Sequence, residues 1–193
     1  MSLPPTQPKN QVLILLGSPR KNGNSAILAD KLAAGVKDAG GEPIVVSLQA
    51  LKIAPCNACE ACLKNPAKGC VIQDDMQSIY LQLKAAHGVV LASPVYWFNY
   101  SAQLKTVIDR TYAIRSNNTS ALTGKKVGIL LTYGDVDLFA SGGVNALRSL
   151  QDMCRFVKAH LVGIVHGSAN SPGDIAKNAD LLAQAFELGK KMV

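Results

Sequence analysis

The sequence predicts an α/β domain in three layers, with a five-stranded parallel sheet covered by helices on both faces. Short apolar runs alternate along the chain with longer segments of helical period. The 193 residues, 48% of them hydrophobic, are enough for one well-buried domain and too few for two. Alternating strands and helices imply parallel strands joined by helical crossovers. We therefore expect a single domain over residues 1–193.

Five short apolar runs predict the strands, at residues 12–16, 44–47, 89–92, 127–132 and 161–166. Five segments of helical period predict the helices, at residues 25–39, 75–86, 101–110, 143–158 and 175–191. Right-handed crossovers favour the flavodoxin-like strand order 2-1-3-4-5. Ligands of such sheets bind beyond the carboxyl ends of the strands, between strands one and three. We therefore expect function in the loops that follow the strands.

Residues 1–10 form an N-terminal arm, with three prolines in the first nine positions and no periodicity. We expect the arm to be disordered alone and, where ordered, to pack on a neighbouring subunit. The N-terminus lacks the charged-then-apolar order of a signal peptide, and no apolar run approaches the roughly 20 residues of a membrane span. These features predict a soluble cytoplasmic protein.

The formal net charge of +7 raises the question of nucleic-acid binding. The lysines are spread over the predicted helices, and only 5% of the residues are aromatic, which argues against a stacking platform for bases. A bound phosphate, or a metal cluster held by thiolates, adds negative charge that this count ignores. We interpret part of the excess as compensation for a cofactor.

The loop after the first predicted strand, residues 17–25, is framed by glycines, rich in hydroxyl and amide groups, and opens a helix. Backbone N–H groups, the helix dipole, and the side chains of Ser18, Arg20 and Ser25 suit one phosphate. The Walker, dinucleotide-binding and cysteine-phosphatase patterns do not fit these residues. Asn24 or Ser25 is also expected to cap the helix, and an ordinary capped turn is the alternative interpretation.

Residues 93–100, after the third predicted strand, contain four aromatic side chains. These rings suit a flat ligand, and packing of Trp97 and Phe98 on the core or on another subunit is the alternative. After the fourth strand, Tyr133 and Gly134 suggest a further contact, because glycine lets backbone approach a ligand. A plain strand-to-helix loop explains these two residues equally well.

Four of the five cysteines lie in a cysteine-rich insertion over residues 54–74. Such clustering argues against disulfides that staple a scaffold and indicates metal or thiol chemistry. The spacing Cys56-x2-Cys59-x2-Cys62-x7-Cys70 suits a compact iron–sulfur cubane, whereas zinc ligands more often form two separated pairs. Thiols without any metal are the remaining alternative.

Other polar residues are expected to be structural. The three histidines share no ligand spacing with a carboxylate. Asp74 and Asp75 precede an apolar periodic run and favour helix capping. Asp109 and Arg110 end a predicted helix and suit a structural ion pair better than catalysis. Cys154 is expected in the core of an amphipathic helix.

Several motifs occur together: Gly-Ser-Pro-Arg-x-x-Gly-Asn-Ser at 17–25, Asp-Asp-Met at 74–76, Ser-Pro-Val-Tyr at 93–96, and Gln-Leu-Lys to Asp-Arg at 103–110. With them the chain resembles the NAD(P)H-dependent FMN reductase family of flavodoxin-like proteins, strongly over residues 11–110. Its cysteine motif resembles that of the iron–sulfur flavoproteins, although the final gap of seven residues is long.

The resemblance implies a set of cofactor contacts. The FMN phosphate contacts would be Ser18, Arg20, Asn22, Asn24 and Ser25. The isoalloxazine ring would lie against Pro94, Val95, Tyr96, Trp97 and Phe98, with further contacts at Tyr133 and Gly134. A [4Fe–4S] cluster would bind Cys56, Cys59, Cys62 and Cys70.

The resemblance also implies the chemistry. Hydride passes from NAD(P)H to the flavin and no catalytic acid is needed, because the ring chemistry belongs to the cofactor. With a cluster, the protein exchanges single electrons between cluster, FMN and a carrier such as a ferredoxin-like protein. Without one, it is a two-electron reductase of flavin, quinone or another small acceptor, or a non-enzymatic FMN-binding redox sensor. Related FMN sites are completed across a subunit interface, so a homodimer or homotetramer is expected.

Overall fold

The computed structural model describes residues 10–115 and 119–193. Its sheet contains five parallel strands, β1 (Gln11–Leu16), β2 (Glu42–Ser47), β3 (Gly88–Tyr96), β5 (Lys126–Tyr133) and β6 (His160–Ser168). These strands lie in the order β2-β1-β3-β5-β6, which is the order predicted for the parallel part of the sheet. Their nearly continuous apolar runs are typical of strands buried on both faces.

A sixth strand differs from the prediction. β4 (Asn99–Tyr100) pairs antiparallel with the end of β3, with Val95 opposite Tyr100. The sequence predicts that the third strand ends at residue 92 and that a loop follows. A two-residue strand leaves no periodic signal, so the expected count of five strands is one too low.

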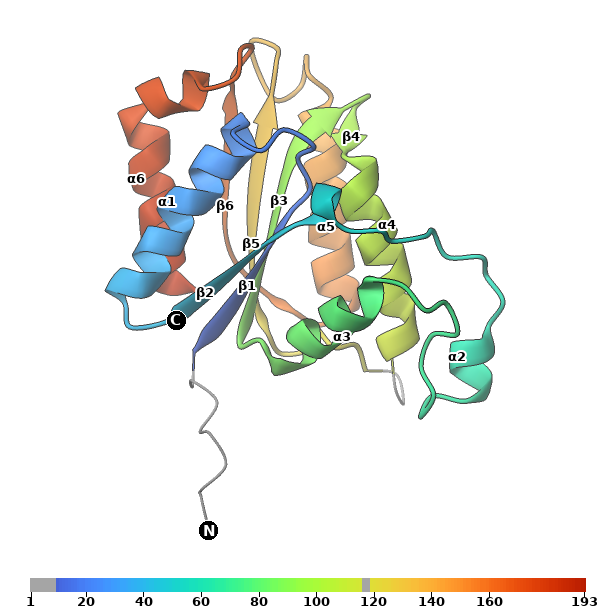
Figure 1. Cartoon of the computed structure of the whole chain (residues 1–193). Helices are drawn as coiled ribbons and strands as arrows, with labels where there is room; N and C mark the ends of the chain where they lie inside the picture. Colours follow the sequence, from blue (N-terminus) through green and yellow to red (C-terminus); the bar gives the residue numbers. More distant parts are fainter. Residues whose placement is uncertain (1–9, 116–118) are drawn as a thin grey trace.

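Helices cover both faces of the sheet (Figure 1). One face carries α1 (Asn24–Asp38) and α6 (Ala179–Lys191), and the other carries α3 (Met76–Ala85), α4 (Ala102–Arg110) and α5 (Gly143–Phe156). Alternate side chains of a strand point to opposite faces. Ile14 therefore packs in the core beneath α1, and Leu15 packs in the core beneath α3.

The predicted helix ends agree with the observed ones to within two residues, except for the last helix. Residues 175–191 were expected to form one helix, but the structure has a 3-10 turn, η3 (Asp174–Lys177), followed by α6. The separation occurs at Asn178, whose side-chain oxygen accepts a hydrogen bond from the N–H of Leu181 at 3.0 Å. This N-cap starts a new helix.

The cysteine-rich insertion leaves β2 through η1 (Leu48–Ala50) and carries the short helix α2 (Ala61–Lys64). α2 lies away from the sheet, beside η2 (Thr111–Ile114), which directly follows α4 (Figure 1). The insertion is therefore placed at the carboxyl end of α4, whereas the loops after the strands gather near its amino end.

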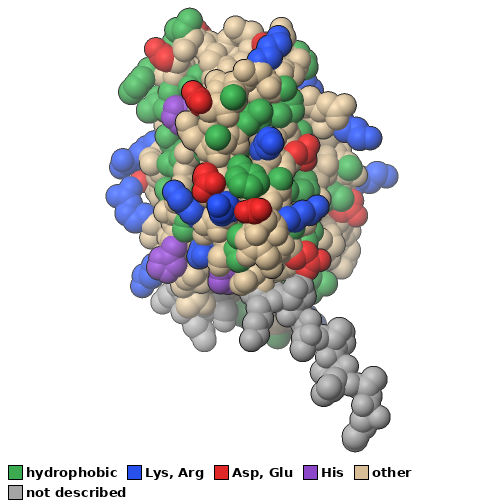
Figure 2. All heavy atoms as spheres, turned by 90° about the vertical axis from the view of Figure 1, so that its left-hand side faces the viewer, with side chains coloured by type: hydrophobic (Ala, Val, Ile, Leu, Met, Phe, Trp, Pro, Cys, Tyr) green, Lys and Arg blue, Asp and Glu red, His purple; other side chains and the backbone are tan. Residues whose placement is uncertain are grey.

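The expected N-terminal arm lies outside the described residues, apart from Asn10. Among the residues that the structure describes, no helix is both long and apolar enough to cross a membrane. Figure 2 shows the side of the molecule that carries α1 and α6, where basic and acidic side chains are interspersed with apolar ones. The distribution of charged side chains therefore indicates no binding site on that face.

Candidate functional site

The loop between β1 and α1 packs closely against β3 and the start of α4. The Gly17 N–H donates to the carbonyl of Ala92 at 2.8 Å. A Cβ at Gly17 would lie 2.6 Å from Oγ of Ser101, closer than side chains tolerate. Only glycine therefore lets this loop meet α4. The contact fixes the loop at the point between β1 and β3 where ligands of such sheets bind.

The start of α1 is open to an anion. Within the described residues, this helix has neither a side-chain cap at its Gly23 N-cap nor an acidic residue in its first turn. The predicted cap by Asn24 or Ser25 is therefore wrong. Ser25 is 1% exposed, and its hydroxyl has no hydrogen-bond partner in the described part of the chain. A buried, unpartnered hydroxyl at the positive end of a helix fits a phosphate oxygen.

Asn24 connects two loops. Its Oδ1 accepts from the N–H groups of Gly173 at 3.0 Å and Ile175 at 3.2 Å. Its Nδ2 donates to the carbonyl of Ser171 at 2.9 Å. The amide therefore holds the segment after β6 against the start of α1. These partners lie about 150 positions away in the chain, so no local spacing could reveal them.

The other predicted phosphate contacts lie on the same loop. The buried Ser18 hydroxyl accepts a hydrogen bond from the Arg20 N–H at 3.1 Å, which stabilises the turn. The side chains of Arg20 and Asn22 are exposed. An exposed guanidinium and amide at the mouth of the loop are available to an anion that enters from solvent.

The β3–β4 hairpin presents two aromatic residues on a strained backbone. Trp97 and Phe98 have φ values of 46° and 64°, which large L-residues rarely adopt. Trp97 is 94% exposed. At the base of the hairpin, the Ser93 hydroxyl accepts from the Ser101 N–H at 2.9 Å and donates to the Pro94 carbonyl at 2.8 Å. Strain and an exposed apolar ring together are typical of a binding surface.

A cavity of about 570 Å³ lies between this hairpin and the loop after β5. Its lining brings together residues predicted from both loops and three more, namely Val95, Tyr96, Trp97, Phe98, Tyr133, Gly134, Asp135, Ala140 and Ser141. Phe98 packs on Gly142, whose φ is 67° and where a Cβ would collide with the aromatic ring. Pro94 is beside the cavity without lining it. Asp135 directly follows the predicted Gly134, whereas Ala140 and Ser141 precede Gly142 and Gly143 and have no other signal in the sequence.

Tyr133 forms the inner wall of this cavity. Its hydroxyl lies 3.1 Å from Nδ1 of His166 on the neighbouring strand β6. Burial raises the pKa of Tyr133 and lowers the pKa of His166, so both side chains are neutral near pH 7. A neutral pair that shares a hydrogen bond gives the cavity a fixed, uncharged wall.

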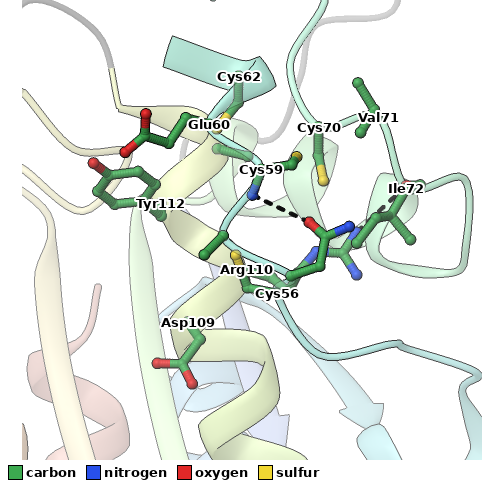
Figure 3. A pocket seen from close by; sticks show the side chains of 13 residues that line it. Cys56, Cys59, Glu60, Cys62, Cys70, Val71, Ile72, Asp109, Arg110 and Tyr112 are labelled. Atoms are coloured by element: carbon green, nitrogen blue, oxygen red, sulfur yellow. Dashed lines mark hydrogen bonds between the residues drawn. The ribbon is translucent and has the colours of Figure 1, made fainter.

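Cys56, Cys59, Cys62 and Cys70 line a second cavity, of about 380 Å³, near the carboxyl end of α4 (Figure 3). All four are free thiols. Burial raises the pKa of the Cys62 thiol, and negative charge on the other three would act in the same direction. In the described ranges, no three Cys, His, Asp or Glu side chains form a group that could hold a metal ion. Thiolates are the donor type that iron–sulfur clusters take.

Asp109 and Arg110 do not pair with each other, contrary to the prediction. Asp109 accepts from Nζ of Lys105 at 2.6 Å, one helical turn earlier. The buried Arg110 guanidinium instead pairs with Asp74 at 2.7 Å. A helix terminus places consecutive side chains about 100° apart, so neighbours in sequence face different partners.

The expected capping by two aspartates is only partly correct. Asp74 accepts from the Met76 N–H at 3.0 Å, at the start of α3. Asp75 occupies the N-cap position without capping the helix through its side chain, and instead accepts from the Lys52 N–H at 2.7 Å. Burial opposes the charge of Asp74, but hydrogen bonds, above all from Arg110, outweigh it and lower the pKa of this carboxyl. Both aspartates tie the two ends of the insertion together.

The fold and these sites define a flavodoxin-like α/β protein, with an uncapped helix start at the sheet switch point and an aromatic cavity beside it. The model of the NADPH-dependent FMN reductase family matches residues 10–186. The chain belongs to this family and is therefore a flavin-dependent oxidoreductase.

Individual relatives agree with this assignment. An iron–sulfur flavoprotein of Methanosarcina thermophila is 40% identical over 118 residues, which cover 61% of this chain and 60% of that relative. An iron–sulfur flavoprotein of Methanocaldococcus jannaschii is 32% identical over 194 residues, which cover 94% of this chain and 95% of that protein. The match to the first relative thus spans less than two thirds of its length.

A solved structure shares the fold. The NAD(P)H:quinone oxidoreductase of Methanothermobacter marburgensis has a TM-score of 0.71 at 18% sequence identity, covering 95% of this chain and 96% of that chain. Such a likeness concerns the arrangement of helices and strands.

Proposed function

We propose that this protein is an electron-transfer flavoprotein that passes electrons between a [4Fe–4S] cluster on Cys56, Cys59, Cys62 and Cys70 and an FMN held at the carboxyl edge of the sheet. The observation that carries the FMN part is the Ser25 hydroxyl, which is buried, unpartnered within the described chain, and located at the uncapped start of α1. A phosphate would supply the missing partner and the negative charge that this helix end favours.

In this proposal, different residues of the chain hold the phosphate and the ring system of the flavin. Ser18, Arg20, Asn22 and the backbone of the loop surround the phosphate position, and Asn24 holds that loop against the segment after β6. Tyr96 to Phe98 and the loop after β5 enclose a cavity for the ring system. FMN, when bound, supplies both hydride and one-electron chemistry, and the protein positions it.

The cluster part rests on the donor set. Four free thiols line one cavity, and relatives that match most of this chain are named iron–sulfur flavoproteins. Thiolates are the usual ligands of such clusters. The carboxylates of Glu60 and Asp109 lie at the edge of the cavity (Figure 3).

A second candidate is an NAD(P)H-dependent FMN or quinone reductase without a cluster. The family match supports a nicotinamide as electron donor. In the described part of the chain the cysteines do not form a group that could hold a metal ion. Reduced thiols that bind no metal would have the same arrangement. A non-enzymatic redox sensor that uses these thiols is a third candidate with the same site.

One experiment separates these candidates. Protein purified anaerobically and reconstituted with iron and sulfide is assayed for iron, acid-labile sulfide and FMN per chain. We expect about four iron atoms and one FMN. FMN in the protein without iron would exclude the cluster-containing flavoprotein, and the reductase and the redox sensor would remain as candidates. Anaerobic bleaching of the flavin by NADH or NADPH then supports the reductase, and no bleaching favours the sensor.

We also propose a homodimer or homotetramer in the cytoplasm, with a small molecule or a ferredoxin-like protein as redox partner. The support is the apolar surface around the ring cavity, where Trp97, Val136 and Phe139 are 94%, 84% and 76% exposed. Light scattering of the holoprotein tests the assembly. A monomeric mass at micromolar concentration would contradict it.

A further inference from the structure

Arg110 is the largest of the fully buried side chains, with 1% exposure. All five of its N–H donors have acceptors. Nη1 donates to the Ala54 carbonyl and to Asp74 Oδ2, both at 2.7 Å. Nη2 donates to Asp74 Oδ1 at 3.1 Å and to the Ile72 carbonyl at 3.4 Å, and Nε donates to the Tyr80 hydroxyl at 3.3 Å. A guanidinium satisfied in this way is rigidly held.

Two of these acceptors flank the cysteine segment, which is the stretch from Cys56 to Cys70 within the cysteine-rich insertion. Ala54 lies two residues before Cys56, and Ile72 lies two residues after Cys70. Arg110 thus joins the stretch of chain that enters the segment to the stretch that leaves it. The Asp74 carboxylate reinforces this link, because it also accepts from the Ala54 N–H at 2.9 Å.

Arg110 also lines the cysteine cavity. Among the described residues that line the cysteine cavity, it is the one basic side chain (Figure 3). Burial opposes its charge, but the hydrogen bonds to Asp74 and Tyr80 and the attraction of a Cys70 thiolate raise the pKa of the guanidinium further. Arg110 therefore stays protonated in the cavity wall, with its charge partly offset by the paired Asp74 carboxylate.

The position of Arg110 connects this cavity to the flavin loops. It is the last residue of α4, and the N-cap of the same helix is Ser101. Ser101 bonds Ser93 at the base of the aromatic hairpin and borders Gly17 of the phosphate loop. One nine-residue helix thus spans from the flavin loops to the cysteine segment.

We propose that Arg110 is the positioning residue of the cysteine segment and the fixed positive charge that sets the redox equilibrium of the group bound there. The charge part rests on the proposed function, because it requires the [4Fe–4S] cluster. One-electron reduction makes a thiolate-bound cluster more negative. A cation held behind the thiols stabilises that reduced state, so its removal favours the oxidised cluster.

The test compares Arg110→Gln and Arg110→Lys with the matched control Arg148→Gln. Arg148 also pairs with an aspartate, Asp152 at 3.0 Å, but on the exposed face of α5. Hydrogen exchange of the isolated protein measures positioning, and an EPR-monitored redox titration measures the cluster. We expect at least tenfold faster exchange over residues 54–72 in Arg110→Gln, and in Arg110→Lys to a lesser degree. The Arg148→Gln control should match the wild type.

In the titration, we expect Arg110→Gln to lower the ratio of reduced to oxidised cluster about tenfold at a fixed potential, which for one electron is a shift of about 59 mV. Arg110→Lys, which keeps the charge, should stay near the wild type. The FMN potential serves as an internal reference. A folded Arg110→Gln variant with unchanged exchange and an unchanged cluster potential would overturn the proposal.

A second variant covers the case in which loss of the buried charge prevents folding. Tyr80→Phe removes the acceptor of Nε and the hydroxyl that donates to the Arg110 carbonyl at 3.0 Å. Burial already raises the pKa of Tyr80 to about 12, so no charge is lost. We expect faster exchange over residues 54–72 with an unchanged cluster potential. Unchanged exchange in both Tyr80→Phe and Arg110→Lys would overturn the positioning role. If wild-type protein takes up no iron, the proposed function fails, while the exchange experiment still decides the positioning role.

Discussion

Replacement of Ser25 by alanine should weaken FMN binding without weakening the fold. The hydroxyl is buried and has no partner among the described residues, so the apoprotein loses no hydrogen bond. In the complex, the hydroxyl would donate to a charged phosphate, and such hydrogen bonds contribute about 1.5–3 kcal/mol. This corresponds to a loss of roughly 10- to 150-fold in FMN affinity. The midpoint of apoprotein unfolding should stay the same or rise.

The assay is quenching of flavin fluorescence on titration with apoprotein, using FMN and riboflavin in parallel. Riboflavin lacks the phosphate, so Ser25→Ala should leave its affinity unchanged. Ser78→Ala provides the matched control, because its exposed hydroxyl only donates to the Asp75 carbonyl on α3. Equal losses for FMN and riboflavin, or no loss for FMN, would refute the location of the phosphate at α1.

Three further predictions concern the loops and the base of the insertion. Gly17→Ala should destabilise the protein by roughly 1–3 kcal/mol in urea unfolding, because its Cβ has no room beside α4, and unchanged stability would show that the loop can move aside. The double variant Trp97→Asn/Phe98→Gly should relieve about 1 kcal/mol or more of backbone strain while weakening FMN binding; if stability falls, the strain argument is wrong. The folded pKa of Asp74 is depressed, so its stabilisation is present above the unfolded pKa of about 3.9 and is lost as pH falls through the folded value. The stability difference between wild type and Asp74→Asn should therefore shrink in acid, and a difference that is constant from pH 7 to pH 3 would contradict this.

Periodicity was sufficient to predict the fold because most elements are long and buried on a defined face. It failed where the signal is shorter than one period. β4 has two residues, and the helix predicted from residue 175 is interrupted by the cap at Asn178. Local sequence determines both features, but only through single hydrogen bonds that no average over a window detects.

The site was predicted loop by loop, whereas its internal contacts were not. The phosphate loop and the aromatic hairpin could be proposed because parallel strands bring their carboxyl ends together. The partners of Asn24 lie about 150 positions away, and Ala54 lies 56 positions from Arg110. Such pairs depend on how helices pack on the sheet, which a single sequence does not encode in its spacing.

The number of electrons that each chain accepts tests the central claim most directly. Holoprotein is titrated anaerobically with dithionite while the flavin and cluster absorbance are followed. FMN takes up two electrons and a [4Fe–4S] cluster takes up one, so the account predicts about three electrons per chain. An end point at about two electrons would contradict the cluster on Cys56 to Cys70, and uptake without any flavin bleaching would contradict FMN on the loop from Gly17 to Ser25.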